Sequence, residues 1–391
     1  MELDKIGQNK RIKPSILIVV VTYLAFISLG LPDGLLGIAW PFMSTRSNVP
    51  LDYLGILLIG FTIGYLSTST TSGKIMKHIS LGMLLAISCF LTACSLLVYA
   101  LVDTWYVMIV ASFFLGSGGG AIDSSINTFA ASRFSASTVN WLHAFYGIGA
   151  TTGPLLVTLM LSMDLDWYHG YVVVAFIQIS LAVLFFMTRK RWLVASGEEH
   201  HTSSEYFQTL RLPIVWVSVM IFFLYTGLEQ GFGQWLFTVL TKSRGITDER
   251  AGLLTVSYWG SLTIGRIFFG IVLTTIPVRN VLSWAMIGIV TGLLLFLVNM
   301  SITTVLGIVI LGVAVAPVFP CLISVTPIRI GKEHAATAIG LQISMAMLGG
   351  ALLPAFAGWM SDKFGLEVIA IIFSVAAGLL ACMYFLSLPR K

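Results

Sequence analysis

The stretch FFLGSGGGAIDSSINTFAA, Phe113 to Ala131, places a carboxylate inside a run of apolar and small residues. As a helix, the run is long enough to cross a bilayer, which takes about 20 mostly apolar residues. Asp123 stands near its middle, and Asn127 follows one helical turn later on the same face. A carboxylate at the centre of a membrane span costs at least ~2.5 kcal/mol by insertion scales. We therefore expect Asp123 to face a central cavity, or to pair with Arg266 or a Ser/Thr hydroxyl inside a helical bundle.

The whole chain has the composition of a membrane protein. Of its 391 residues, 57% are hydrophobic and 10% are charged, against roughly 25% charged in a soluble domain. This composition predicts an integral, multi-pass membrane protein in contact with the lipid bilayer. Twelve windows are long and apolar enough to span it, near residues 15–42, 51–73, 79–101, 104–132, 138–162, 169–188, 213–241, 250–275, 278–299, 301–326, 335–360 and 366–387.

The longest polar connection divides these windows into two sets of six. We predict an all-α membrane protein of twelve transmembrane helices, with an N-terminal half (1–188), a cytoplasmic linker (189–212) and a C-terminal half (213–391). Short matches at similar offsets predict that the halves are pseudo-repeats. The pairs are TIGYL at 62–66 with TIGRI at 263–267, GATTGP at 149–154 with GGALLP at 349–354, and GLPDG at 30–34 with GLEQG at 227–231.

The basic residues predict the orientation. With the N-terminus inside, sixteen of the 22 lysines and arginines fall in inner segments and five in outer loops, which is the bias expected of cytoplasmic segments. Both termini should then be cytoplasmic, and we expect a bacterial inner (plasma) membrane. The first apolar run is too long for a signal peptide, so it should be retained as the first span. The basic residues flank apolar runs rather than forming one polar face, so no nucleic acid partner is expected.

Other function classes find no support. The four cysteines, Cys89, Cys94, Cys321 and Cys382, lie inside apolar runs without metal-ligand spacing, and a solvated linker explains the His200-His201 pair. We expect no metal and no cofactor. The chain has no Walker-type glycine loop and no nucleophile elbow, so neither ATP-driven transport nor enzymatic hydrolysis is expected.

Two more acids lie within spans. Asp33 stands between Pro32 and Gly34, so we expect either a broken or bent first helix that opens on a polar site, or an interfacial aspartate near the outer end. Glu229 lies near the middle of its span, and nearby are Gln230, Gln234 and Trp235. An acid, amides and a flat ring are typical of a site for a hydroxylated solute. The alternative for Glu229 is a buried structural hydrogen bond.

Three further residues have two interpretations each. His143 in NWLHAFYG has two interpretations. It is either a proton relay, because histidine side chains have a pKa near neutrality, or a neutral side chain that forms a hydrogen bond between helices. Arg266 lies within a span and must be paired, more consistently as a structural or gating counter-charge than as a ligand-binding group. Asp362 in GWMSDKFG belongs either to a gate or to a polar turn.

Over its full length the chain resembles a major facilitator superfamily transporter. GKIMKHISLG, at 73–82, takes the place of that family's G-x-x-x-D-R-x-G-R-K loop, with Lys77 at the acidic position. Segments 118–128 (GGGAIDSSINT), 142–155 (LHAFYGIGATTGPL) and 228–237 (LEQGFGQWLF) most resemble the branch of fucose-proton symporters and sodium-dependent glucose transporter-like proteins. By that resemblance, Asp33 and Asp123 serve coupling and substrate binding. Thr128-Phe129 departs from the Asn-Pro-Tyr ending of the fucose symporters, so fucose itself is not implied.

These observations predict a secondary active transporter that moves a small polar solute, a sugar or sugar-like compound, by proton-coupled alternating access. A carboxylate shielded from water holds a proton more readily than one in water, and Na⁺ is the other coupling ion considered. Asp33, Asp123 and Glu229 are the coupling candidates. The substrate-binding candidates are Asp123, Asn127, His143, Glu229, Gln230, Gln234 and Trp235.

The competing transport function is a proton-coupled multidrug efflux antiporter. The segment GIGATTGPLL, at 147–156, resembles the G-x-x-x-G-P motif of facilitator antiporters, and aromatic residues and methionines are abundant. A sensor or a lipid scramblase is a third possibility. A monomer suffices for the transport mechanism.

Overall fold

The computed structural model describes residues 16–134, 136–192 and 203–388, and within these ranges it contains helices and no strand. Eleven of its helical segments are long and apolar enough to cross a membrane. Helix α9 (Asp248–Val272) has 25 residues and makes the twelfth crossing, although it carries four charged side chains. The predicted all-α architecture of two six-helix halves is confirmed.

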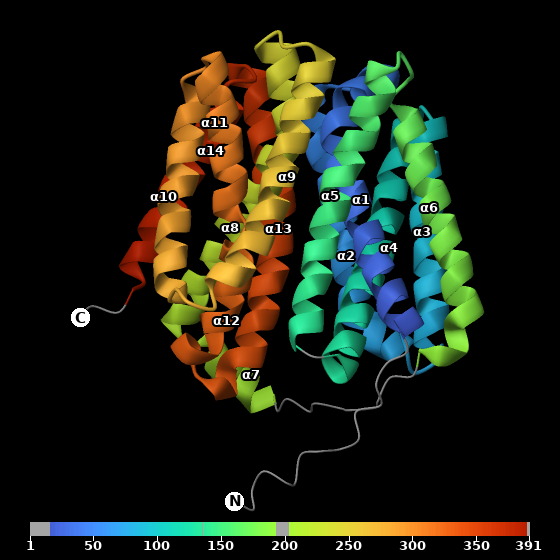
Figure 1. Cartoon of the computed structure of the whole chain (residues 1–391), viewed down its shortest axis with the longest axis vertical. Coiled ribbons are helices and arrows are strands. Elements are labelled where there is room, and N and C mark those ends of the chain that lie inside the picture. The colour runs from blue at the N-terminus through green and yellow to red at the C-terminus, as the bar shows by residue number, and fades with distance from the viewer. Residues whose placement is uncertain (1–15, 135, 193–202, 389–391) are drawn as a thin grey trace, which may run out of the picture.

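Figure 1 shows the two halves as bundles standing side by side. The N-terminal bundle contains α1 (Ile16–Arg46), η2 (Leu51–Tyr53), α2 (Leu54–Ile75), α3 (Leu81–Leu101), α4 (Trp105–Arg133), α5 (Ala136–Ser162), α6 (Tyr168–Thr188) and η3 (Arg189–Arg191). The short helix α7 (Ser203–Leu210) comes before the second bundle. That bundle contains α8 (Pro213–Thr238), η4 (Val239–Ser243), α9, α10 (Val278–Leu297), α11 (Ser301–Val315), α12 (Val318–Ile330), α13 (Lys332–Phe364) and α14 (Val368–Leu386).

The two bundles repeat one packing scheme. In the first, α1 packs on α5, α2 on α4, and α3 on α4 and α6; in the second, α8 packs on α13, α9 on α11, and α10 on α11 and α14. Glycines hold matching helices close together. A Cβ atom added at Gly149 would lie 2.0 Å from the carbonyl oxygen of Ile27, and one at Gly349 would lie 2.1 Å from that of Phe223. Small residues at such crossings let helix backbones approach within a membrane.

An arginine at the end of the first helix ties three helices of the N-terminal half. Arg46 of α1 donates a hydrogen bond to the carbonyl oxygen of Ala100 in α3, over 2.8 Å, and pairs with Asp103. Its guanidinium lies 6.0 Å from the ring centroid of Trp167, at the start of α6. This corner joins α1, α3 and α6.

The C-terminal half has the matching corner. Arg244, which follows α8, donates to the carbonyl oxygen of Phe296 in α10 over 3.1 Å. It also pairs with Glu367, next to α14, at 2.9 Å. Arg46 and Arg244 therefore fasten equivalent helices in the two halves.

The first helix is not broken at Asp33, because α1 runs through Pro32 without interruption. Proline lacks the N–H that would bond the carbonyl four residues earlier. That carbonyl belongs to Ser28, and it accepts a 2.8 Å hydrogen bond from Gln178 of α6 instead. The interruption that does occur separates α11 from α12 at Ala316 and Pro317, within a window expected to be one helix.

The halves touch at one end of the molecule. The lower end in Figure 1 carries α7, and we call it the linker side and the opposite end the far side. On the far side, a Cβ atom at Gly55 of α2 would lie 2.5 Å from that of Ala355 in α13, and one at Gly252 of α9 would lie 2.5 Å from the hydroxyl of Thr158 in α5. The halves are thus closed against each other on the far side.

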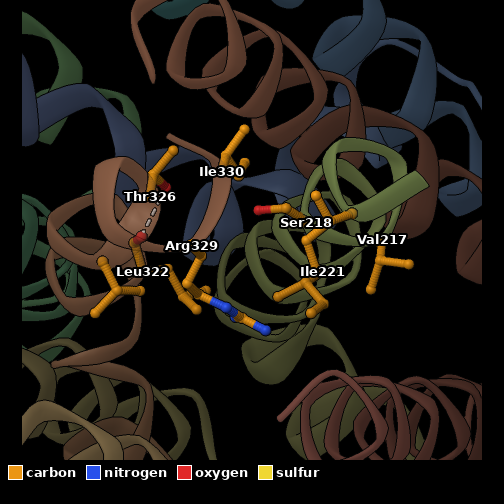
Figure 2. A pocket seen from close by; sticks show the side chains of 9 residues that line it. Val217, Ser218, Ile221, Leu322, Thr326, Arg329 and Ile330 are labelled. Carbon is orange, nitrogen blue, oxygen red and sulfur yellow. Dashed lines mark hydrogen bonds between the residues drawn. The ribbon is translucent and has the colours of Figure 1, made fainter. Parts of the chain in front are cut away.

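A small void lies within the C-terminal half on the linker side (Figure 2). Its volume is about 10 Å³, between α8 and α12, which is room for one water. Beside it, the buried Gln342 of α13 donates to Ser218 of α8 and accepts from Thr326 of α12 over 3.1 Å. This network joins α8, α12 and α13, and leaves no space for a larger ligand.

Candidate functional site

One large cavity lies between the two halves. Its volume is about 1020 Å³, and its wall includes residues of α1, α2, α4 and α5 on one side and of α8, α9, α12 and α13 on the other. It extends from the middle of the helices to Trp141 and Leu273, near the linker-side ends of α5 and α9. All three acids that the sequence places within spans, Asp33, Asp123 and Glu229, line it.

Asp123 is held by two donors. Tyr65 of α2 donates to one carboxylate oxygen over 2.5 Å, and the amide of Asn127 donates to the other over 2.9 Å. The glycine run before Asp123 makes this possible, since a Cβ atom at Gly120 would lie 2.3 Å from the backbone oxygen of Tyr65. Asp123 and Asn127 thus share a face on the cavity wall.

Asp33 joins three helices at the middle of the cavity. The hydroxyl of Tyr146 in α5 donates to its carboxylate. The amide of Gln234 in α8 donates to its backbone oxygen over 2.7 Å. Asp33 therefore lies between the halves, which distinguishes it from the alternative of an interfacial aspartate.

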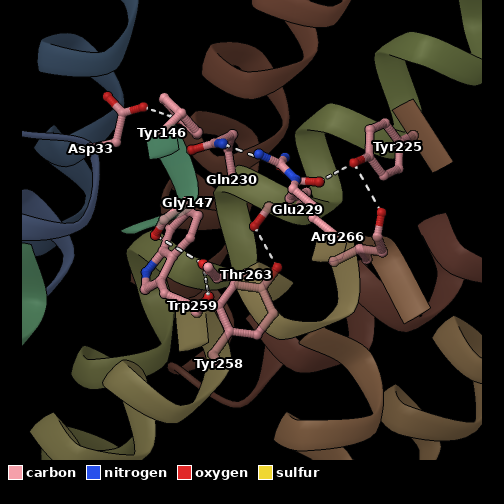
Figure 3. A network of polar contacts seen from close by, with 11 residues as sticks. Asp33, Tyr146, Gly147, Tyr225, Glu229, Gln230, Tyr258, Trp259, Thr263 and Arg266 are labelled. Carbon is pink, nitrogen blue, oxygen red and sulfur yellow. Dashed lines mark hydrogen bonds and ion pairs between the residues drawn. The ribbon is translucent and has the colours of Figure 1, made fainter. Parts of the chain in front are cut away.

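Glu229 is the most enclosed of the three, with 4% of its surface exposed. Arg266 of α9 lies 3.4 Å from one of its oxygens, and the hydroxyl of Tyr225 donates to the other. The Arg266 guanidinium also lies 5.6 Å from the ring centroid of Tyr146. Figure 3 shows Glu229 and Arg266 between Tyr225 on one side and Tyr146 with Asp33 on the other. Arg266 is thus paired as expected, with Glu229 rather than with Asp123.

Three polar atoms on the C-terminal wall lack a hydrogen-bond partner in the described part of the chain. They are the hydroxyl of Thr226, the side-chain oxygen of Gln234 and the Nε of Arg266, all buried and all from cavity-lining residues. A buried polar group left unpaired costs about 1–3 kcal/mol. Water or the hydroxyl groups of a ligand can supply the missing partners once a movement of the wall exposes these atoms to the cavity. Three acids against one arginine favour a neutral or cationic ligand.

Some predicted site residues lie elsewhere. Trp235 is fully buried and its indole donates to the backbone oxygen of Pro354 over 2.9 Å, so it has no surface to offer a ligand in this conformation. Asp362 lies at the far-side end of α13, one turn after Gly358, where an added Cβ atom would lie 3.4 Å from the Cα atom of Asp52 in η2. Gln230 lines the cavity 3.5 Å from Glu229. The side chain of His143 lies outside the described residues.

The sequence match to known proteins settles the family. The family described as Major Facilitator Superfamily matches residues 22–247 and 236–391. The chain belongs to this superfamily.

Several facilitators resemble this one over most of their length. The glucose/mannose transporter GlcP of Bacillus subtilis (strain 168) is 24% identical over 371 residues, covering 92% of this chain and 91% of its own. Sodium-dependent glucose transporter 1 of Homo sapiens is 24% identical over 410 residues, covering 92% of this chain and 77% of its own. A solved single-site variant of the E. coli fucose:proton symporter FucP has a TM-score of 0.65 at 16% identity, covering 96% of this chain and 99% of its own.

The glucose transporters among these relatives agree with the resemblance drawn from the sequence, and the facilitator is a transporter rather than an enzyme. The tyrosine partners of the three acids were missed from the sequence. A tyrosine within an apolar span is usually explained by packing of its ring, so its hydroxyl was not considered as a hydrogen-bond donor. One signal was present: Tyr225 precedes Glu229 by four residues, the spacing that had already placed Asp123 and Asn127 on one face.

Proposed function

We propose that this facilitator carries a neutral, hydroxylated solute, a sugar or sugar-like compound, together with protons. The observation that carries the proposal is the placement of three acids, each with a tyrosine partner, on the wall of one cavity between two movable halves. The names of the bacterial and human relatives, both glucose transporters, support a sugar.

The polar chemistry of the wall suits hydroxyl groups. Carboxylate and amide oxygens accept hydrogen bonds from hydroxyls, while the Arg266 Nε–H and the Gln230 amide can donate to them. Thr226 can do either. The excess of acids over bases within the membrane disfavours an anionic solute, because like charges repel most strongly where water is scarce.

Transport then proceeds by alternating access. With the far side closed and the cavity reaching the linker side, a rocking of the two bundles would close the linker side and open the far side, as in transporters built from repeats. In the proposed orientation both termini and the linker face the cytoplasm of a bacterium, so this state opens inward. The unit of transport in this proposal is a monomer.

Protons are the proposed coupling ion, with Na⁺ as the alternative. Each acid already contacts a tyrosine, and a carboxylic acid can both donate and accept where a carboxylate only accepts. Uptake of a proton by Asp33, Asp123 or Glu229 would therefore rearrange the hydrogen bonds that hold the cavity wall. Such a rearrangement links proton binding to the shape of the cavity.

Transport by purified protein tests the proposal. Proteoliposomes enclosing a pH-sensitive dye would be given glucose, mannose, galactose, fucose or a nucleoside, under a proton gradient or a Na⁺ gradient. We expect a hexose to enter together with protons, and Glu229→Gln to abolish the dye response. Hexose uptake driven by Na⁺ alone would overturn proton coupling but leave the substrate class, whereas no hexose movement in either gradient would overturn the substrate class.

Efflux of amphipathic compounds remains the second candidate because of the aromatic side chains in the cavity wall, among them Phe26, Phe61, Trp141, Phe269 and Phe319. The same liposomes distinguish it. An exporter would expel a lipophilic cation such as ethidium in exchange for protons, so the dye response to that compound would have the opposite sign.

A further inference from the structure

Tyr225 stands between two hydrogen-bond acceptors. Its buried hydroxyl contacts the carboxylate of Glu229 and lies 3.1 Å from the backbone oxygen of Val315. A phenol carries one hydrogen, so it can donate to one of these acceptors at a time. Which acceptor receives the hydrogen depends on whether Glu229 carries a proton.

The second acceptor lies at the interruption between α11 and α12. Val315 is the last residue of α11, and Ala316 and Pro317 after it are not helical. Carbonyls at a helix C-terminus lack the amide partners that helix interiors provide. Ala316 and Pro317 also line the cavity, so the position of this interruption shapes the cavity wall.

The two protonation states of Glu229 give two bonding patterns. When Glu229 is ionised, the charge-assisted bond to its carboxylate is the stronger one and takes the Tyr225 hydrogen. When Glu229 is protonated, its own O–H can donate to the Tyr225 oxygen, which leaves the phenolic hydrogen for Val315. One proton enters on Glu229 in this change, and Tyr225 keeps its own hydrogen throughout.

The other groups around Glu229 leave this choice to Tyr225. Arg266 pairs with the opposite carboxylate oxygen and also interacts with the Tyr225 oxygen, but a guanidinium can only donate, so it does not compete for the phenolic hydrogen. Tyr258 donates to the Glu229 backbone oxygen over 2.8 Å. Asp33 and Tyr146 form a hydrogen bond with each other, and Arg266 lies between this pair and Tyr225. Tyr225 is therefore the group whose hydrogen bond to Val315 depends on the protonation state of Glu229.

We propose that Tyr225 is a proton-dependent positioning residue, which fastens the α11–α12 interruption to α8 when Glu229 is protonated and releases it when Glu229 is ionised. The proposal deepens the proposed function and rests on it only for the role of Glu229 as a proton carrier in transport. It adds the hydrogen-bond change by which protonation of Glu229 alters the cavity wall.

A distance measurement tests the switch without any substrate. Spin labels at Met220→Cys in α8 and Ile328→Cys in α12, two exposed positions, would be introduced into full-length protein lacking its four native cysteines. Pulsed EPR in nanodiscs at about pH 5 and about pH 8, on either side of neutral pH, would then follow the separation of α8 and α12. We expect the distance distribution to change with pH, and Tyr225→Phe to abolish the change.

Tyr258→Phe is the matched control, because it removes a hydroxyl that bonds the Glu229 backbone rather than its carboxylate. We expect it to retain the pH-dependent change. Glu229→Gln supplies a second variant: its amide N–H can donate to Tyr225 as a protonated acid does, so the low-pH distance should persist at both pH values. A change that survives in Tyr225→Phe, or that is absent from the unaltered protein, overturns the switch.

Transport separates this proposal from the proposed function. Tyr225→Phe should lower gradient-driven accumulation relative to equilibrium exchange by roughly 10- to 100-fold, the worth of a hydrogen bond to a charged group, whereas Tyr258→Phe should lower both rates alike or neither. If the EPR change depends on Tyr225 but transport does not depend on the proton gradient, the proposed switch is supported and proton coupling is contradicted. If transport is proton-driven but Tyr225→Phe leaves both measurements unchanged, the switch fails and the proposed function stands.

Discussion

At the scale of single residues, the tyrosines explain how three acids persist within the membrane. Each carboxylate accepts a hydrogen bond from a tyrosine, and Asp123 and Glu229 have further donors in Asn127 and Arg266. These donors replace part of the hydration that the carboxylates lose, while an open cavity supplies the rest. The acids can therefore remain both buried and available to a ligand or a proton.

Asp123→Asn tests the first of these acids. The amide preserves the size of the side chain but removes its charge, so we expect gradient-driven uptake to fall to the level of protein-free liposomes while the melting temperature stays within a few degrees. Flux and thermal unfolding of the purified protein measure the two effects. Asp103→Asn makes the same change outside the cavity and should leave uptake largely intact; equal loss in both variants would contradict a special role for Asp123.

Thr226→Val tests the unpartnered hydroxyl on the cavity wall. Valine has the same shape and removes a polar group that lacks a partner, so stability without ligand should be unchanged or higher. Loss of one hydrogen bond to a ligand hydroxyl should raise KM by roughly 2- to 10-fold with kcat little changed. KM and melting temperature would be measured together. An unchanged KM with lower stability would mean that the hydroxyl supports the fold instead.

The sequence predicted which acids line the cavity but not which residues pack around them. The cost of an intramembrane carboxylate singled out Asp33, Asp123 and Glu229, and all three line the cavity. Trp235 was misplaced because its spacing from Glu229 does not reveal that the indole is packed against α13. Helical spacing reports which residues share a face, whereas the neighbour of that face depends on helix packing.

At the scale of helices, glycines set the crossing of α8 and α13. A side chain at Gly349 would meet the Phe223 backbone at 2.1 Å, while one at Gly340, in the same helix, would meet nothing within 4 Å. Gly349→Ala should therefore destabilise the protein by about 1–3 kcal/mol through overpacking, and Gly340→Ala should stabilise it by up to about 1 kcal/mol through helix propensity. Thermal unfolding of both variants checks this contrast; equal effects would show that α13 can shift to make room.

The Arg244–Glu367 pair on the far side makes the stability of the protein depend on pH. Hydrogen bonds from the Arg244 guanidinium lower the pKa of the Glu367 carboxyl, because they favour its ionised form. A group whose pKa is lower when folded adds stability above its unfolded value, near 4.3 for glutamate, and loses it as the pH falls through the folded value. The melting temperature of the unaltered protein should exceed that of Glu367→Gln most above about pH 5, and the gap should narrow toward about pH 3. Glu249→Gln, at an exposed acid, is the control; a gap that stays constant with pH would contradict the assignment.

The helices themselves were well predicted, and their interruptions were not. Apolar length placed the twelve spans because a membrane demands a minimum run of apolar residues. Pro32 and Pro317 look alike as sequence signals, yet α1 continues through Pro32 while α11 ends two residues before Pro317. The difference depends on whether another helix can satisfy the freed carbonyl, as Gln178 does for Ser28.

At the scale of the whole molecule, the two halves should rock against each other, in addition to the change inside the C-terminal half at the α11–α12 interruption. The contacts between Thr158 and Gly252 join α5 to α9 across the far side, with 3.1 Å between the Thr158 Cβ and a Cβ built at Gly252. A disulfide between Thr158→Cys and Gly252→Cys, in protein without native cysteines, should hold the far side closed and stop transport until it is reduced. Flux before and after dithiothreitol provides the measurement.

A disulfide within one half is the control. Thr92 and a Cβ built at Gly118 lie 3.5 Å apart between Cβ atoms, in α3 and α4 of the N-terminal half, a separation that suits a disulfide. Because this bond would not cross between the halves, transport should continue with it oxidised. Loss of transport in both variants would argue against a rocking of the halves.

The arginine corners at Arg46 and Arg244 have a mechanical consequence for the surrounding lipid. Because Arg244 fastens α8 to α10 and lies against α14 through Glu367, a displacement of α8 beside Glu229 must carry those two helices with it. Neither α10 nor α14 contributes to the described cavity wall, and both present large apolar side chains outward, including Trp284, Ile287, Ile371 and Val375. Each transport cycle would then move these surfaces through the acyl chains. The rate of turnover would therefore depend on the thickness and stiffness of the bilayer.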